Sequence, residues 1–188
     1  MTTERFLVLG SNSFSGSHFV RHLLDCGHEV LGTSRSEEPD EAFLAHRWGE
    51  VTGFRFEQID LNHDLDRLMG LIKDMEPSHV VNFAAQGMVE QSWENPDHWY
   101  QTNVVAQVRL HDELRRVGSL RKYVHISTPE VYGSTDGVVR ESFDFSPTTP
   151  YAVSRAACDL HLRSFYQAYG FPVVFTRAAN VYGPGQQL

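Results

Sequence analysis

Short apolar runs rich in β-branched residues alternate with longer stretches of helical periodicity, and this alternation constrains the fold more than any other feature of the chain. Six runs are apolar on both faces and are bounded by polar residues or turn formers, as buried strands are: residues 5–10, 28–34, 54–60, 79–85, 122–128 and 172–179. Four stretches between them have helical character: residues 15–27, 63–75, 96–117 and 151–169. The pattern predicts an α/β fold, a doubly wound parallel sheet with helices on both faces.

Composition limits the class of protein. The 188 residues are 41% hydrophobic and show no repeat or linker, so we expect one domain over residues 1–188. The net charge of -8, without a basic run, argues against binding nucleic acid or an anionic membrane. No segment resembles a secretion signal or is long enough to span a bilayer. We therefore expect a soluble cytoplasmic protein.

Cysteine and histidine residues give little sign of a disulfide or a metal site. Cys26 and Cys158 fall in predicted helices without a CxxC motif, so we expect two reduced, packed thiols. His18 and His22 have a metal-ligand spacing, but no third ligand stands near them. The remaining candidates are scattered: His63, His98 and His111. We expect no metal site.

The first predicted strand runs directly into the turn GSNSFSG, residues 10–16, which opens a helix. A glycine turn at a helix N-terminus presents free backbone N–H groups and the positive end of the helix dipole to a phosphate. Such a turn after the first strand of an α/β chain indicates a Rossmann-type dinucleotide site rather than an ordinary strand-to-helix connection. The residues expected to hold the pyrophosphate are Gly10, Ser13, Phe14, Ser15 and Gly16, with Ser13 offering its backbone N–H where a second glycine is usual.

The second predicted strand ends in TSRS, residues 33–36, where an NAD site usually has an acidic residue. Arg35, with Ser34 beside it, suits a 2'-phosphate because a guanidinium offers several donors to phosphate oxygens. The alternative is a solvated surface arginine. We therefore expect NADP or NAD as cofactor, with NADP preferred.

Four further stretches, NFAAQ, ISTPEVYG, YAVSR and TRAANVYGPG, follow in order along the chain. With the glycine turn they resemble the extended short-chain dehydrogenase/reductase family, in particular its nucleotide-sugar 4,6-dehydratases and epimerases. The resemblance implies a nucleotide-sugar substrate and a C-terminal lobe that would complete the pocket. The sequence stops at GPGQQL, where that lobe would begin, so we expect the Rossmann-type lobe of a larger enzyme, with the substrate lobe absent.

The resemblance also implies roles for individual residues. Thr128 would hydrogen-bond the sugar 4-hydroxyl, Tyr151 would remove its proton as a phenolate, and Glu130 would take the C5 proton. Arg155 stands where the family has lysine; four residues after Tyr151, it would supply the positive charge and contact the nicotinamide ribose. Further cofactor contacts would come from Asp60, Leu61, Ala84, Ala85, Gln86, Asn103, Tyr151 and Ala178, and substrate contacts from Gln86, Thr128 and Asn180.

Family members pair as dimers through two helices, so we expect a homodimer through the helices near 97–117 and 151–169. The loop-like stretch 130–150 is long for a compact domain and is expected beside the site. Three alternatives to the dehydratase remain open: a nucleotide-sugar 4-epimerase, a nucleotide-glucuronate decarboxylase, and a cofactor-binding protein without turnover. The last is suggested by Ser13, Pro129 and Arg155, which depart from the family pattern.

Overall fold

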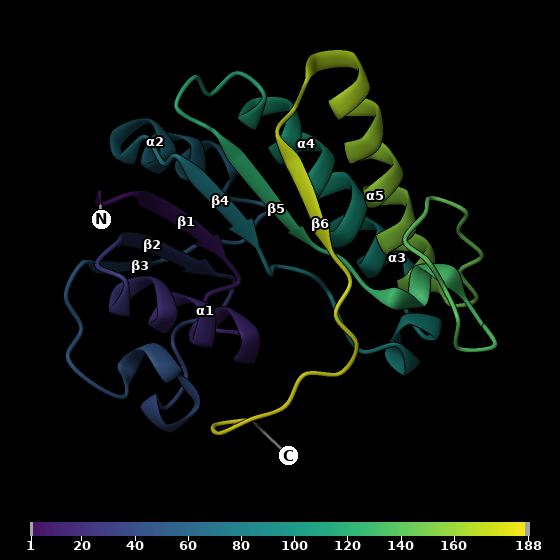
Figure 1. Cartoon of the computed structure of the whole chain (residues 1–188), viewed down its shortest axis with the longest axis horizontal. Coiled ribbons are helices and arrows are strands. Elements are labelled where there is room, and N and C mark those ends of the chain that lie inside the picture. The colour runs from purple at the N-terminus through teal and green to yellow at the C-terminus, as the bar shows by residue number, and fades with distance from the viewer. Residues whose placement is uncertain (1, 187–188) are drawn as a thin grey trace.

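Six parallel strands form one sheet through the centre of the molecule in the computed structural model, which describes residues 2–186 (Figure 1). The strands are β1 (Arg5–Leu9), β2 (Glu29–Ser34), β3 (Phe54–Gln58), β4 (His79–Asn82), β5 (Lys122–Ile126) and β6 (Val173–Thr176). Their order across the sheet is β3-β2-β1-β4-β5-β6. Residues 1, 187 and 188 of the predicted domain 1–188 lie outside the described residues.

Strand order reverses at β1, which pairs with β2 on one side and with β4 on the other. Leu7 is opposite Leu31 of β2 and Val80 of β4, and all three side chains are buried. Crossovers leave in opposite directions from this point, so a crevice opens at the carboxyl ends of β1 and β4.

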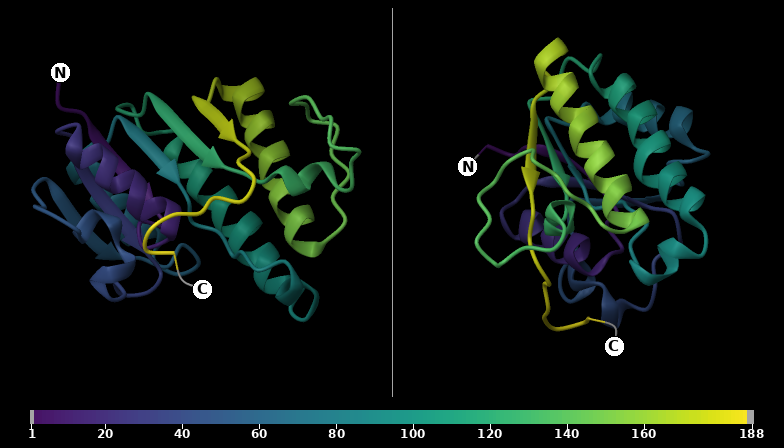
Figure 2. Two further views of the ribbon diagram at one scale, coloured as in Figure 1. Left: turned by 60° about the horizontal axis from the view of Figure 1, so that its bottom comes forward. Right: turned by 90° about the vertical axis from the view of Figure 1, so that its right-hand side faces the viewer.

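Helices cover both faces of the sheet, as predicted. One face carries α1 (Phe14–Asp25) with the short turns η1 (Glu41–Phe43) and η2 (Ala45–Arg47). The other face carries α2 (Leu65–Met75), α4 (Ala106–Leu114) and α5 (Pro150–Tyr169). Figure 2 shows α4 and α5 side by side on that second face, with α1 on the opposite side of the strands.

Alternate residues of the central strand supply two hydrophobic cores. Leu7 and Leu9 point to the larger core, which α2, α4 and α5 complete with Leu68, Leu110 and Leu162. Val8 points to the smaller core, against Val20 and Leu23 of α1. Because successive side chains of a strand point to opposite faces, a strand covered on both faces is apolar throughout.

The helix predicted over residues 96–117 is instead three segments: α3 (Pro96–Tyr100), a π-helical turn η4 (Gln101–Val105) and α4. The wider turn holds Asn103, whose side chain bonds outward to the loop after β4. Such turns break the regular hydrogen-bond ladder and frequently mark functional sites. Two more short turns, absent from the prediction, are η3 (Glu90–Trp93) and η5 (Pro129–Tyr132).

Two expectations about burial were wrong. Strand β3 lies at the sheet edge, and none of its residues is fully buried, so it is not apolar on both faces. Cys26 is exposed at the end of α1, whereas Cys158 is buried as expected. Within residues 2–186, no helix has the length and apolar character needed to cross a membrane.

Candidate functional site

The turn between β1 and α1 can accept only glycine at two positions. Gly10 has a φ of +79°, and a Cβ there would lie 2.7 Å from the backbone nitrogen of Ala84. A Cβ on Gly16 would lie 2.2 Å from the carbonyl oxygen of Gly10. The missing side chains allow the turn, the first turn of α1 and the end of β4 to approach closely.

Ser13 caps α1, and this changes its predicted role. Its hydroxyl accepts the N–H of Gly16 at 3.1 Å, and its own N–H donates to the Gly10 carbonyl at 3.0 Å. The expectation that Ser13 offers a free N–H is therefore wrong. Among the described residues, no hydrogen bond uses the N–H of Phe14 or Ser15, so these two groups remain available at the helix N-terminus.

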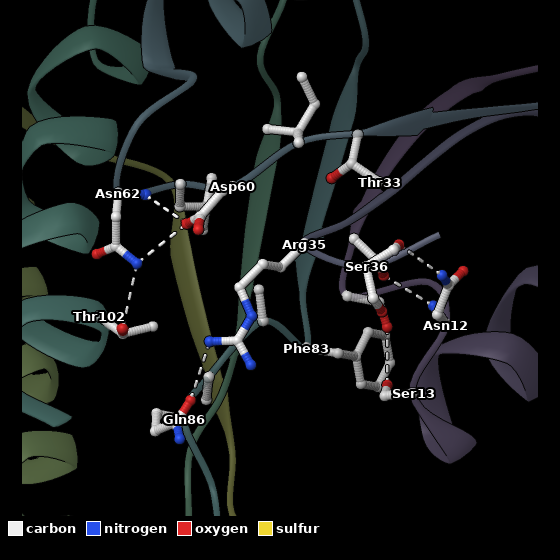
Figure 3. Close-up of a pocket in the computed structure, with 16 residues that line it drawn as sticks. Asn12, Ser13, Thr33, Arg35, Ser36, Asp60, Asn62, Phe83, Gln86 and Thr102 are labelled. Carbon is white, nitrogen blue, oxygen red and sulfur yellow. Dashed lines mark hydrogen bonds between the residues drawn. The ribbon is translucent and has the colours of Figure 1, made fainter. Parts of the chain in front are cut away.

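A cavity of about 300 Å³ opens at the carboxyl ends of β1 to β4, beside this turn (Figure 3). It is lined by nine of the predicted cofactor residues: Gly10, Ser13, Ser34, Arg35, Asp60, Leu61, Ala84, Ala85 and Gln86. The sequence did not indicate the other lining residues: Asn12, Thr33, Ser36, Ile59, Asn62, Phe83 and Thr102. Four strand ends thus form one elongated site.

Polar side chains bridge the two ends of this cavity (Figure 3). The Arg35 guanidinium reaches from the end of β2 to the loop after β4 and donates to Gln86 Oε1 at 3.3 Å. Asp60 accepts the backbone N–H and the side-chain N–H of Asn62 at 2.9 and 3.0 Å. Asn62 also donates to Thr102 at 3.3 Å, which ties β3 to the π-helical turn.

Thr128 and Glu130 lie where β5 ends, and Tyr151 lies in the first turn of α5, the helix that packs against η5. Thr128 is buried, and its hydroxyl accepts the N–H of Glu130 at 3.2 Å. The Glu130 side chain is exposed. Tyr151 is half-buried in the first turn of α5, which Thr149 caps by accepting the N–H of Ala152.

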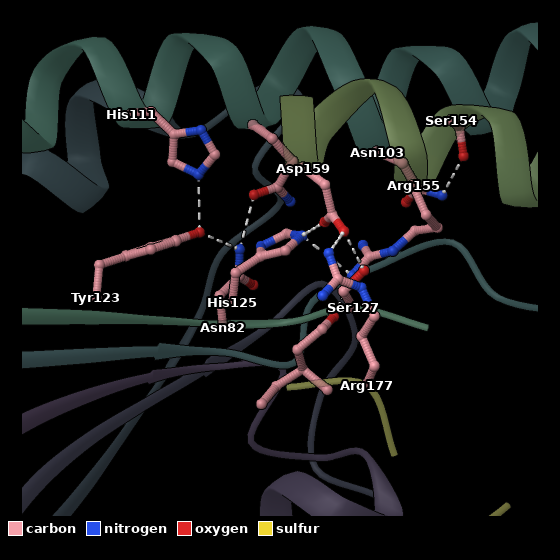
Figure 4. A network of polar contacts seen from close by, with 12 residues as sticks. Asn82, Asn103, His111, Tyr123, His125, Ser127, Ser154, Arg155, Asp159 and Arg177 are labelled. Carbon is pink, nitrogen blue, oxygen red and sulfur yellow. Dashed lines mark hydrogen bonds and ion pairs between the residues drawn. The ribbon is translucent and has the colours of Figure 1, made fainter. Parts of the chain in front are cut away.

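The Arg155 side chain lies between α5 and β5, beside His125 and Asp159 (Figure 4). This side chain is buried; Nη2 donates to the Ile126 carbonyl and lies 3.3 Å from His125 Nε2. Among the described residues no hydrogen bond joins Arg155 to Tyr151. A contact between Arg155 and the cofactor ribose therefore requires the guanidinium to turn, and stays a prediction.

Asp159, one turn after Arg155, is the buried acid of the same region (Figure 4). It accepts bonds from Arg177 and Ser127, each at 2.8 Å. Burial raises the pKa of Asp159, and burial together with Arg155 lowers the pKa of His125. Arg177 therefore bonds this buried carboxyl group, whereas no hydrogen bond joins Arg155 to it among the described residues.

The chain was compared with known proteins. The sequence profile of the family described as GDP-mannose 4,6 dehydratase matches residues 7–188. The chain belongs to this family. A dTDP-glucose 4,6-dehydratase of Xanthomonas campestris pv. campestris is 38% identical over 95% of the chain, and the match covers 54% of that enzyme. The chain thus spans about half the length of the curated relatives it matches.

Solved structures of two activities resemble this member of the GDP-mannose 4,6 dehydratase family. A dTDP-glucose 4,6-dehydratase from Streptomyces venezuelae, with NAD bound, has a TM-score of 0.85 and 33% identity, covering 97% of this chain and 57% of that one. A UDP-N-acetylglucosamine 4-epimerase from Methanobrevibacter ruminantium has a TM-score of 0.86 and 30% identity, covering 100% and 58%. These findings confirm the predicted Rossmann-type fold and the resemblance to extended short-chain dehydrogenases/reductases.

Several predicted contacts do not line the cavity in this family member: Phe14, Ser15, Gly16, Asn103, Thr128, Tyr151, Arg155, Ala178 and Asn180. Ala178 and Asn180 are exposed on the segment after β6 and do not line the cavity. Their roles toward cofactor and substrate stay predictions.

The structure also gathers side chains that looked unrelated in the sequence. His111 of α4, His125 of β5 and Cys158 of α5 are all buried, with ligand-type atoms within 4.8 Å of one another. Burial raises the pKa of Cys158 to about 12 and lowers the pKa of His111 well below its usual value. A protonated thiol and neutral imidazoles next to Arg155 fit a packed interior, and we assign them no metal.

Proposed function

We propose that this chain is the cofactor-binding part of an NAD(P)-dependent nucleotide-sugar 4,6-dehydratase. Such an enzyme oxidises C4 of the sugar, eliminates water across C5 and C6, and returns the hydride. The observation that carries the proposal is that α5, which begins with Tyr151 in its first turn, packs against η5, which follows Thr128 and holds Glu130, in a fold with a cavity suited to a dinucleotide. The relatives named dTDP-glucose 4,6-dehydratase support it.

The cavity fits a dinucleotide for reasons visible in this structure. Gly10 and Gly16 leave a cradle that a Cβ would fill, and Phe14 and Ser15 have N–H groups free for a pyrophosphate. Arg35 is an exposed cation at the rim of the same cavity, where a 2'-phosphate would gain a charge-assisted bond. We therefore propose NADP before NAD.

In this proposal two residues carry out the proton transfers, Tyr151 at the 4-hydroxyl and Glu130 at C5. Tyr151 takes the proton of the sugar 4-hydroxyl, and Thr128 donates a hydrogen bond to that oxygen, because its own oxygen already accepts the N–H of Glu130. When bound, the nicotinamide dinucleotide accepts a hydride from C4 and returns it at C6. The exposed carboxylate of Glu130 is free to remove the C5 proton, which the 4-ketone makes acidic, and to pass it to the C6 hydroxyl, which leaves as water. A proton from solvent returns to C5 when the hydride adds at C6.

A 4-epimerase is the second candidate, because a solved UDP-N-acetylglucosamine 4-epimerase has nearly the same fold over this chain. Epimerisation needs no base at Glu130, so this residue favours the dehydratase. A decarboxylase acting on nucleotide-linked glucuronate could also use Glu130. A protein that binds cofactor without turnover is the remaining alternative, and the buried position of Arg155 favours it over a fully active site.

We also propose a cytoplasmic homodimer. Tyr100 and Val105 on the α3–η4 segment and Val153 and Leu160 on α5 are apolar side chains with exposed fractions of 37 to 45%. Such a patch on adjacent helices suits a second copy of the chain. The free thiols of Cys26 and Cys158 are usual in a reducing compartment.

The test uses the full-length protein and a panel of nucleotide sugars, with product masses measured. We expect loss of one water; loss of carbon dioxide would indicate a decarboxylase, and unchanged mass with inversion at C4 an epimerase. Glu130→Gln should still accumulate reduced cofactor but lose no water. Glu141→Gln, an exposed carboxylate in the same loop, is the matched control and should behave as wild type. Bound cofactor that no sugar reduces would favour the protein without turnover.

A further inference from the structure

We infer that two buried serines, Ser92 and Ser154, position Tyr151 by holding its backbone from both sides, and that Asn103 connects this bracket to the cofactor cavity. The bracket is Ser92, Asn103 and Ser154. They act through Tyr151 and Gln86, so they are positioning residues. The consequence for reaction rate rests on the proposed function, whereas the bracket itself is a property of the fold.

Ser92 holds the amino side of Tyr151. It lies in η3, after β4, and its side chain is fully buried. Its hydroxyl donates to the Val89 carbonyl at 2.6 Å and accepts the Tyr151 N–H at 3.2 Å. Tyr151 is the second residue of α5, so its N–H has no acceptor within the helix. Ser92, 59 residues earlier in the chain, supplies that acceptor.

Ser154 holds the carbonyl side of Tyr151. Its hydroxyl donates to the Tyr151 carbonyl at 2.7 Å and accepts Nδ2 of Asn103 at 3.0 Å (Figure 4). The first bond alone is an ordinary helix feature, since the exposed Ser164 donates to the His161 carbonyl at the same distance. The bond from Asn103 distinguishes Ser154, because it ties the first turn of α5 to a different element.

Asn103 carries the connection to the cavity. It is fully buried in the π-helical turn, where its Oδ1 accepts the Gln86 N–H at 2.7 Å and its Nδ2 donates to the Gln86 carbonyl at 3.0 Å. With Ser154 as the second acceptor, both amide hydrogens of Asn103 have partners. This role differs from the predicted contact between Asn103 and the cofactor.

Gln86 closes the path, because it lines the cavity and accepts a bond from Arg35 across it. A ligand that fixes the position of Gln86 therefore also fixes Asn103, which bonds the Gln86 backbone. Asn103 in turn holds Ser154, which bonds the backbone of Tyr151. A ligand that favours one arrangement of the loop that carries Gln86 also favours one placement of Tyr151, and the coupling is reciprocal. Dinucleotide binding is thus expected to order Tyr151 before any substrate arrives.

The first experiment needs no catalysis. Hydrogen exchange of the Tyr151 amide is measured by NMR in the full-length protein, with and without NADP. We expect exchange about tenfold faster in Ser92→Ala, which loses the acceptor. Ser164→Ala is the matched control, with the same residue type and the same helix bond but no partner elsewhere, and its Tyr151 exchange should equal wild type. NADP should slow this exchange in wild type and much less in Ser154→Ala.

The second experiment measures single-turnover reduction of the cofactor. Ser92→Ala and Ser154→Ala should slow it about tenfold with little change in cofactor affinity, and Ser154→Thr, which keeps the hydroxyl, should restore most of the rate. In a Tyr151→Phe background neither alanine variant should slow the residual rate further, because both act through Tyr151.

Two results would overturn the inference. One is a Tyr151 amide exchange rate that is unchanged in Ser92→Ala, and the other is a loss of cofactor-reduction rate in Ser164→Ala as large as in Ser154→Ala. If wild type reduces no cofactor with any sugar, the proposed function fails, and the exchange experiment still decides whether the bracket exists.

Discussion

Arg35 and Arg155 carry the same chemical group, and their surroundings give them different chemistry. Arg35 is exposed and makes one long bond, so its other donors can meet a ligand. Arg155 is 2% exposed and bonds a main-chain carbonyl, which leaves its guanidinium in the interior. At the scale of a residue, the identity of a side chain does not decide its function; access to the ligand does.

The exposed arginine leads to a prediction about cofactor choice. Replacing Arg35 by Ala should weaken NADP binding by about 1.5 to 3 kcal/mol, the scale of a charge-assisted hydrogen bond, and leave NAD binding nearly unchanged. Calorimetric titration of both cofactors checks this. Arg55→Ala, an exposed arginine outside the cavity, is the control. Equal losses for both cofactors, or a wild-type preference for NAD, would contradict the role of Arg35.

At the scale of elements, α4, β4 and β5 meet through buried polar groups as well as hydrophobic ones. The Tyr123 hydroxyl lies between His111 Nε2 at 2.8 Å and Asn82 Nδ2 at 2.7 Å. Burial raises the pKa of Tyr123 far above its usual range and lowers that of His111. These groups are neutral in the fold, and the packing of the three elements depends on their staying so.

A pH dependence of stability follows from His111. Because its pKa is lowered in the folded state, the unfolded chain binds a proton that the folded chain does not as the pH falls below about 6.5. The free energy of unfolding is thus highest above that pH and drops by about 1.4 kcal/mol per pH unit for this group below it. His111→Gln should flatten the slope by that amount in urea unfolding between pH 5 and 7. His22→Gln, at an exposed position, should leave the slope unchanged.

At the scale of the whole molecule, the helices of the second face leave part of their apolar surface uncovered. In the described residues α3 and α4 lie beside α5, with Tyr100, Val105, Val153 and Leu160 exposed along them. A homodimer through this surface would bury side chains of α5, the helix that carries Tyr151, so association and site geometry would share one helix (Figure 1).

The dimer prediction is tested by a charge in that surface. Leu160→Arg should weaken association at least tenfold, because an unpaired guanidinium would be buried against the partner, and sedimentation equilibrium should show monomer where wild type is dimeric. Val138→Arg, at a position 86% exposed in the loop after β5, should remain dimeric. A monomeric wild type at micromolar concentration would contradict the proposal.

Local patterns in the sequence were enough to predict the parallel sheet, most of the helices and the glycine turn between β1 and α1. Alternation of buried strands with helices leaves few topologies, and Gly10 and Gly16 are required by contacts within one turn and its immediate neighbours. The periodicity of apolar residues did not predict the π-helical turn at residues 101–105. Asn103 stabilises this break in the helical hydrogen bonds through a side-chain bond to Gln86, and such a bond does not alter the pattern of apolar residues.

Contacts between distant segments were decided only by the tertiary structure. Spacing placed Tyr151 and Arg155 on one helix face, but the packing of α5 against β5 turned Arg155 toward the Ile126 carbonyl. The bond from the Tyr151 N–H to Ser92 spans 59 residues. The sequence by itself determined what each segment can form, since that depends on residues within about one turn or one strand. Which side chains meet across segments depends on how the sheet and helices pack. For this reason the bonds that Ser92, Asn103 and Ser154 make with distant segments emerged only in the fold.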